Sequence, residues 1–241
     1  MSTTYILLNS AEPSVLDGSS PGDFTVQLGR SHAFEDSEVY LSEAVIPFTW
    51  HNVTSENGSL VVGSKTIALP PAYYESIPAL CKAIAGALKA ASLSSVKITA
   101  DERSMKVTID TGMSPVRGPL LRLLGWPKNA TVHGRVTAPK MADITEGDSS
   151  LYVLVDCIED TTAGSFSIPL LKKLEVGRED RPGDLMHYCA HNPVEVHRLN
   201  QSVLMHVAVT IKDSRNRVME FNGFNVNLTL DIRPILIIPK V

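Results

Sequence analysis

The chain has 241 residues, a formal charge of −4 at pH 7 and an isoelectric point near 6.0. This length suits one large β-domain or a domain with an insertion, and an apolar fraction of 44% excludes a disordered chain. A weakly acidic chain gains little from phosphate contacts, so general nucleic-acid binding is not expected. No window approaches the ~20 apolar residues of a membrane span.

Alternating patterns predict strands in the first part of the chain. Apolar and polar residues alternate over residues 24–28 and again over 39–44, which is typical of strands with one buried face. Pro47 should end or bulge the second strand, because proline cannot donate to the ladder. Two shorter strands are expected at residues 60–62 and 65–69, on either side of a turn.

The apolar spacing then changes from a strand period to a helical one. Residues 76–91 carry apolar side chains every three or four positions, which predicts an amphipathic helix capped by Ser76. A hairpin is expected over residues 96–110, followed by a brief helix at 120–124.

The second half of the chain returns to strand patterns. The expected strands are residues 151–158, 165–168, 203–211, 218–221 and 224–231. Many short strands with little helix indicate a mainly β protein, a sandwich or barrel, with a small α+β insertion.

The domain organisation follows from these elements. Residues 1–65 and 128–241 are assigned to the sandwich, and residues 66–127 to an inserted strand–helix–hairpin–helix unit. Residues 128–148 are polar and rich in turn formers, and are interpreted as a long loop. Residues 175–200 carry no clear pattern.

Cysteine usage bears on the compartment. Cys81, Cys157 and Cys189 are an odd count without a CxxC pair, so free thiols in a reducing intracellular compartment are expected. The start of the chain, Met1–Leu8, has no basic region and only a very short apolar run, so no signal peptide is expected.

Three histidines raise the possibility of a metal site. A metal-dependent jelly-roll enzyme of the cupin kind would place a His-x-His or His-x-Asp/Glu pair on one strand, with a distant third histidine. His187, His191 and His197 are instead spaced by four and six residues in a segment that does not read as a strand. Loop or surface histidines are the favoured interpretation, and no metal or cofactor is expected.

Other catalytic motifs are absent from the sequence. There is no G-x-S-x-G nucleophile motif, no cysteine lies in a recognisable activating context, and the glycines are too scattered for a phosphate loop. The prediction is that the protein is not an enzyme.

Short motifs in a fixed order carry a resemblance to a known family. They are Phe24-x-Val26-x-Leu28, Glu43-Ala44-Val45-Ile46-Pro47, Trp50-His51-Asn52-Val53, Leu69-Pro70-Pro71-Ala72-Tyr73-Tyr74, Leu124-Gly125-Trp126, Leu151-Tyr152-Val153, Ile168-Pro169-Leu170-Leu171, Asp213 and Phe221-Asn222-Gly223. The order resembles the penton (minor capsid) proteins of Polinton/Maverick elements, adintoviruses and virophages. Ala72 stands where that family usually has glycine.

The resemblance implies a role in a viral shell. It implies a single jelly-roll that forms a homopentamer, plugs the fivefold vertices of an icosahedral capsid and contacts a double jelly-roll major capsid protein. The expected location is then the virion capsid, after synthesis inside the host. The candidate subunit-interface residues are Phe48, Trp50, Ile235, Leu236, Ile237 and Ile238.

Two other hypotheses remain open. One is the metal-dependent jelly-roll enzyme that would use the three histidines. The other is a jelly-roll adhesion or carbohydrate-binding module, a class that usually shows exposed aromatic residues on turns and a secretion route; the sequence shows neither.

Overall fold

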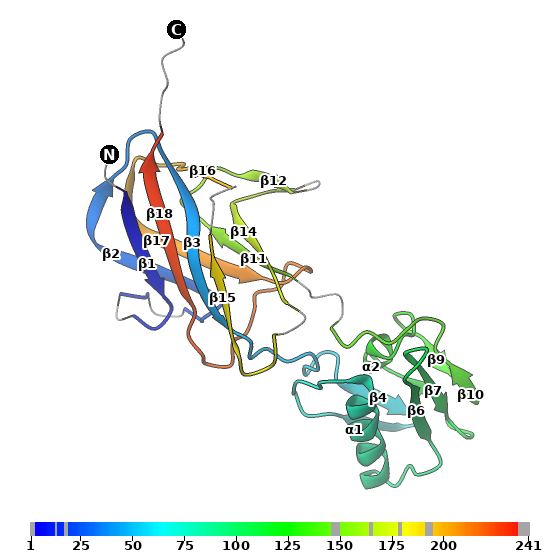
Figure 1. Ribbon diagram of the computed structural model, residues 1–241. Coiled ribbons are helices and arrows are strands. Elements are labelled where there is room, and N and C mark those ends of the chain that lie inside the picture. Colours follow the sequence, from blue (N-terminus) through cyan, green and yellow to red (C-terminus); the bar gives the residue numbers. More distant parts are fainter. Residues whose placement is uncertain are drawn as a thin grey trace. The chain divides into compact units, whose positions relative to one another are not determined.

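The computed structural model divides the chain into two compact units (Figure 1). It describes residues 3–12, 14–16, 19–145, 150–163, 166–177, 180–190 and 195–235. Unit 1 comprises residues 1–50 and 148–241, and unit 2 comprises residues 51–147. Unit 2 is thus an insertion between two parts of unit 1, with wider bounds than the 66–127 expected from the sequence.

The first sheet of unit 1 is antiparallel and has the order β1-β18-β3-β15, with β16 also paired to β3. Its strands are β1 (Thr4–Asn9), β3 (Ser37–Pro47), β15 (Leu185–Cys189), β16 (His197–Arg198) and β18 (Asn227–Pro234). Strand β3 ends at Pro47, as predicted from the missing donor of proline.

The second sheet is also antiparallel and has the order β14-β11-β17-β2. Its strands are β2 (Asp23–Ala33), β11 (Ser150–Val155), β14 (Leu170–Glu175) and β17 (Val203–Lys212). A separate hairpin joins β12 (Thr161–Ala163) to β13 (Phe166–Ile168).

The chain crosses between the two sheets at most connections, which is the jelly-roll arrangement. Strand β1 lies in the first sheet, β2 in the second and β3 in the first; β14 and β15, like β17 and β18, also lie in different sheets. The inward faces supply the core, with Leu8 and Val39 from one sheet and Phe24 and Val207 from the other almost completely buried. The predicted mainly β fold is confirmed.

Unit 2 has two small sheets and two helices. One sheet has the order β5-β4-β8-β9 and the other β10-β7-β6. The elements are β4 (Ser59–Val62), β5 (Lys65–Ala68), α1 (Ile77–Ala90), β6 (Lys97–Asp101), β7 (Lys106–Asp110), β8 (Val116–Arg117), α2 (Leu120–Leu123), β9 (Thr131–Val132) and β10 (Arg135–Thr137). Strand β4 belongs to this unit because Leu60 and Val62 are buried in its core.

Local sequence signals explain the helices of unit 2. The Ser76 hydroxyl accepts a hydrogen bond from the Ala79 amide (3.3 Å) and caps α1, as predicted. The chain turns sharply after α2 at Gly125, whose φ of +95° suits glycine. A Cβ there would lie 2.4 Å from the Lys140 carbonyl oxygen, so the close approach also requires glycine.

Several sequence predictions were wrong in detail. The polar segment 128–148 contains the short strands β9 and β10, which are held by pairing with β8 and β7. The strand expected at residues 218–221 is reduced to one bridge, between Lys212 and Val218. Strand β18 begins at Asn227, three residues after the predicted start at residue 224. Strands β1 and β15 were not predicted.

A β-bulge in β17 alters the predicted faces of that strand. The register against β2 shifts between Leu204 and His206. Leu204 and Val207 are therefore both buried, whereas Met205 is 63% exposed. The simple alternation expected over residues 203–211 holds only beyond the bulge.

Candidate subunit-contact surfaces

An aromatic cluster forms where β3 leaves the first sheet. The Phe48 and Trp50 rings stack with centroids 4.1 Å apart, and Trp50 meets Phe221 edge-on at 6.1 Å. The Thr49 hydroxyl donates to the Phe221 carbonyl oxygen (2.7 Å), and the Asn222 side chain donates to the Thr49 carbonyl oxygen. The cluster therefore ties the end of β3 to the turn before β18.

The burial of these rings differs. Phe48 is only 4% exposed, so its packing is largely completed within its own chain, whereas Trp50 is half-buried. Ile235 is half-buried, and its amide donates to the Asp36 carbonyl oxygen (2.8 Å). Leu236, Ile237 and Ile238 lie outside the described residues, and the role of all six residues in subunit contact stays a prediction.

One flank of the sandwich is formed by the open edges of β14 and β15, each of which pairs with a single neighbour along its length. Between them lies a cavity of 290 Å³, here called the β14–β15 groove. Its apolar floor is formed by Ala44, Ile46, Leu174 and Met186. The groove is smaller than most small-molecule sites, which measure about 300–1,000 Å³.

The rim of the groove carries charge of both signs. Glu175 is highly exposed and lies 3.7 Å from the Lys173 ammonium. Asp180 accepts a hydrogen bond from the Gly177 amide, and His187 completes the polar lining. Two carboxylates against one lysine make this rim weakly acidic.

The opposite flank is formed by β1 and β2 (Figure 1), and apolar side chains are exposed on this side of the sandwich. Tyr5 and Leu7 on the edge strand β1 are 65% and 67% exposed. On β17, next to β2, Val203 and Met205 are exposed as well. Large apolar side chains on neighbouring positions of an edge strand are typical of surfaces that another chain covers.

A polar network closes the outer face of the first sheet. The Tyr40 hydroxyl donates to the Asp231 carboxylate (2.7 Å), and Arg233 pairs with Glu38 (2.6 Å). The hydrogen bond to Asp231, followed by burial, raises the pKa of Tyr40 to about 12. Tyr40 and Glu38 lie on β3 directly opposite Asp231 and Arg233 on β18, so these contacts strengthen the pairing of the two strands.

The histidines considered as metal ligands are far apart. His187 on β15 lies opposite Val45 of β3, and His197 on β16 lies opposite Val39. Six residues along a strand span roughly 20 Å, so these two side chains cannot ligate one ion. His191 lies outside the described residues, among which no group of three potential ligands comes together.

The thiols differ in environment. Burial raises the pKa of Cys81 to about 11 and that of Cys157, which also lies beside Asp156, to about 12. Both thiols therefore stay protonated at neutral pH, whereas Cys189 is exposed. None of the described helices is long and apolar enough to cross a membrane.

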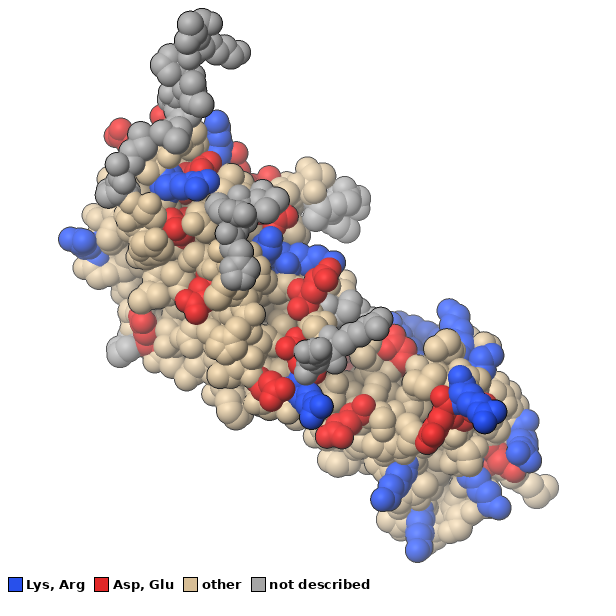
Figure 2. Space-filling model, viewed as in Figure 1, with Lys and Arg blue, Asp and Glu red and all other residues tan. Residues whose placement is uncertain are grey.

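The two units differ in charge. Unit 1 has 11 Lys and Arg against 19 Asp and Glu, a net charge of −8, and unit 2 has 11 against 7, a net charge of +4. Figure 2 shows many of the basic side chains of unit 2 on its surface. Helix α1 carries Lys82 and Lys89, both exposed and two turns apart on one face, and has no acidic residue.

The chain passes back and forth between the two sheets of unit 1, and unit 2 is inserted into it. These features define a single jelly-roll protein with an α+β insertion. No protein-family model matches the sequence, and no curated protein does. Among solved structures, the crystal structure of the mavirus penton protein matches with a TM-score of 0.50 and 10% sequence identity, covering 96% of this chain and 100% of that chain. The chain therefore shares its fold with that penton protein, over the jelly-roll and the insertion together.

A chain of the Sputnik virophage structure, determined by cryo-electron microscopy, also matches. Its TM-score is 0.49 at 10% identity, over 95% of this chain and 97% of that chain. The jelly-roll fold implied by the ordered sequence motifs is confirmed by the likeness to the mavirus penton protein.

Sequence reasoning missed both flanks of the sandwich. The signal for the β1 flank was present, because Tyr5, Ile6, Leu7 and Leu8 are consecutive apolar residues in an otherwise polar start. Such a run is typical of a strand covered on both faces. The groove had no local signal, since it is built from β3, β14 and β15.

Proposed function

We propose that this protein is a structural capsid component, a penton of the kind found in virophages and Polinton-like elements. In this proposal it forms homopentamers at the fivefold vertices of an icosahedral shell, beside a double jelly-roll major capsid protein, and catalyses no reaction. The observation that carries the proposal is the likeness in fold to the mavirus penton protein over the whole of that chain.

The two flanks of unit 1 suit ring formation. One flank presents the exposed apolar residues of β1 and β17, and the other presents two open sheet edges around a groove. Different surfaces on opposite sides allow a heterologous contact, which forms a closed ring when the rotation between neighbours divides a full turn. A pentamer uses five identical contacts of this kind.

The free thiols fit assembly in the host cell interior followed by residence in the virion capsid. Two of the three thiols are buried and protonated, and the described residues form no disulfide.

The proposed partners are further copies of this chain and the major capsid protein.

Mass photometry of the purified full chain tests the proposal. The expected result is a species of five times the 26.2 kDa chain mass, growing at the expense of monomer as concentration rises. A strictly monomeric protein at high concentration would contradict it. Added chelator should leave the mass distribution unchanged, since no metal takes part.

A further inference from the structure

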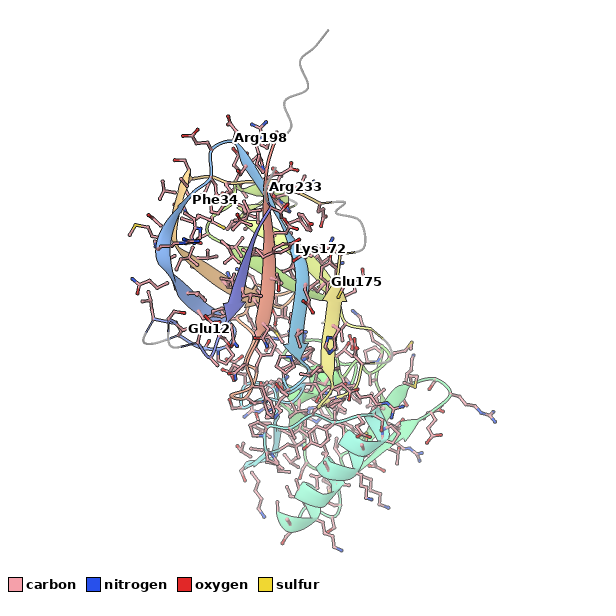
Figure 3. The ribbon with its side chains drawn as sticks, turned by 60° about the vertical axis from the view of Figure 1, so that its left-hand side comes forward. Glu12, Phe34, Lys172, Glu175, Arg198 and Arg233 are labelled. Atoms are coloured by element: carbon pink, nitrogen blue, oxygen red, sulfur yellow. The ribbon has the colours of Figure 1, made fainter. Side chains whose placement is uncertain are left out.

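The β14–β15 groove is built to receive an extended apolar segment. Among the described residues both flanking strands are sheet edges, and the outer N–H and C=O groups of a sheet edge can pair with a further strand. The floor residues Ile46, Leu174 and Met186 are apolar, and the volume of 290 Å³ admits a few side chains. Figure 3 marks this flank by Lys172 and Glu175, and the β1 side by Glu12.

The end of the sequence has the matching chemistry. Residues 235–238 read Ile-Leu-Ile-Ile between Pro234 and Pro239, and Lys240 follows. Three of these four residues are β-branched isoleucines, which favour an extended backbone. Exposing four consecutive large apolar residues to water is unfavourable, and burying them in an apolar groove is favourable.

The geometry of the first sheet excludes the chain's own groove as the place for this segment. Strand β18 ends at Pro234, which pairs with Ser37, whereas Met186 in the groove pairs with Ile46. Nine residues of strand separate those positions on β3, or about 30 Å. The groove residue of β3 nearest to Ser37 is Ala44, still seven residues or about 23 Å away. Three residues of extended chain reach only about 10 Å from Ile235, so they cannot enter this groove.

Charge complementarity supports a second copy of this chain as the source of the segment. The groove rim carries Glu175 and Asp180 against Lys173, and the segment brings Lys240 close behind its apolar residues. The nearby Lys172 ammonium is paired with Glu195 (2.8 Å), so an added ammonium would balance the second carboxylate of the rim. An exposed ion pair between Lys240 and the rim contributes little to affinity, but it favours one orientation of the segment in the groove.

We propose that residues 236–238 of one copy bind in the β14–β15 groove of a neighbouring copy, with Lys240 against the acidic rim. This rests on the proposed ring, and it assigns a donor segment and a receiving site to each contact. Because every copy both gives a segment and receives one, the exchange runs in a single direction around the ring.

Disulfide trapping tests the exchange directly. In a Cys189→Ser background, the buried thiols of Cys81 and Cys157 react slowly, so paired substitutions report on chosen sites. Met186→Cys with Ile237→Cys should give, under mild oxidation, a ladder of covalent oligomers up to five chains on a non-reducing denaturing gel. Mixing the two single variants should give dimers and nothing larger.

A second pair guards against misfolding of a core substitution. Glu175→Cys replaces an exposed side chain, and with Ile237→Cys it should also cross-link between copies. Met113→Cys, fully exposed on unit 2 and outside the proposed ring contact, is the matched control and should not cross-link to Ile237→Cys. A disulfide forms only when the two Cα atoms come within about 7 Å, so the contrast is sharp.

The outcomes separate this inference from the proposed function. Rings without any cross-link, or a bond within one chain, overturn the exchange and leave the penton proposal standing. Cross-linked chains that do not close into rings support the exchange and contradict the pentamer. Monomers without cross-links overturn both.

Discussion

The two units of this protein expose apolar residues in different ways. In unit 1 several of them lie on strands at the flanks of the sandwich, as Tyr5, Leu7 and Met205 do. In unit 2 the most exposed is Met113, which lies in a turn outside any strand. Strand-borne apolar residues form continuous surfaces that a neighbour can cover, whereas an isolated residue on a turn does not.

The two units also differ in net charge. The net charge of −8 on unit 1 opposes the +4 on unit 2, so the overall −4 hides two surfaces of opposite sign. The proposed association through the flanks of unit 1 should therefore be separable from the inserted basic unit, which has its own core.

The largest expected effect is on the core of unit 2. Ile84→Ala removes a buried side chain of α1 and should cost about 2–5 kcal/mol of stability. Because Ile84 belongs to the core of unit 2 alone, calorimetry should show one transition lowered and the other unchanged. Mass photometry should find assembly intact; loss of assembly would show that the units are not separable.

The next effect concerns the β1 flank. Tyr5→Ser with Leu7→Ser removes two exposed apolar side chains and should weaken self-association by about 10–100-fold, since each buried apolar side chain contributes on the order of 1 kcal/mol or more. Monomer stability should change little. Met113→Ser, on unit 2, is the control, and an equal loss of association from it would remove the distinction between the surfaces.

A smaller effect is expected from the polar network of the first sheet. Tyr40→Phe removes the hydrogen bond to the buried Asp231 and should cost about 1–2 kcal/mol at pH 8. The pKa of Tyr40 is raised from 10.0 to about 12, so its contribution is complete below pH 10 and is lost as pH rises through 12. Urea unfolding of both proteins should show the gap narrowing between pH 10 and 12; a constant gap would mean that Tyr40 does not titrate in this way.

The smallest effect tests the charge of unit 2. Despite its net negative charge, the protein should be retained on a cation-exchange resin at low ionic strength through unit 2. Lys82→Gln with Lys89→Gln should lower the salt needed for elution. Lys173→Gln on unit 1 removes an exposed lysine as well, and an equal shift from it would show that retention is not confined to unit 2.

The sequence predicted those elements whose pattern is local. The apolar spacing and the Ser76 cap place α1, and strict alternation places β2, β3 and most of β17. Strands β9 and β10 could not be read, because short polar strands are held by partners elsewhere in the chain. The bulge after Leu204 likewise depends on pairing with β2.

The candidate contact surfaces were harder to predict than the fold. Phe48 was expected at a subunit contact, yet it stacks within an aromatic cluster completed by Phe221, distant in sequence. The groove joins Ile46, Leu174 and Met186 from three strands that only the folded sandwich brings together. Composition and order of motifs indicated a shell protein, and the tertiary structure supplied the surfaces.

Class averages of the purified full chain by electron microscopy test the central claim most directly. The account predicts closed rings with fivefold symmetry in which unit 1 makes the contacts between neighbours. Particles without closed rings, or rings of another symmetry, would contradict it.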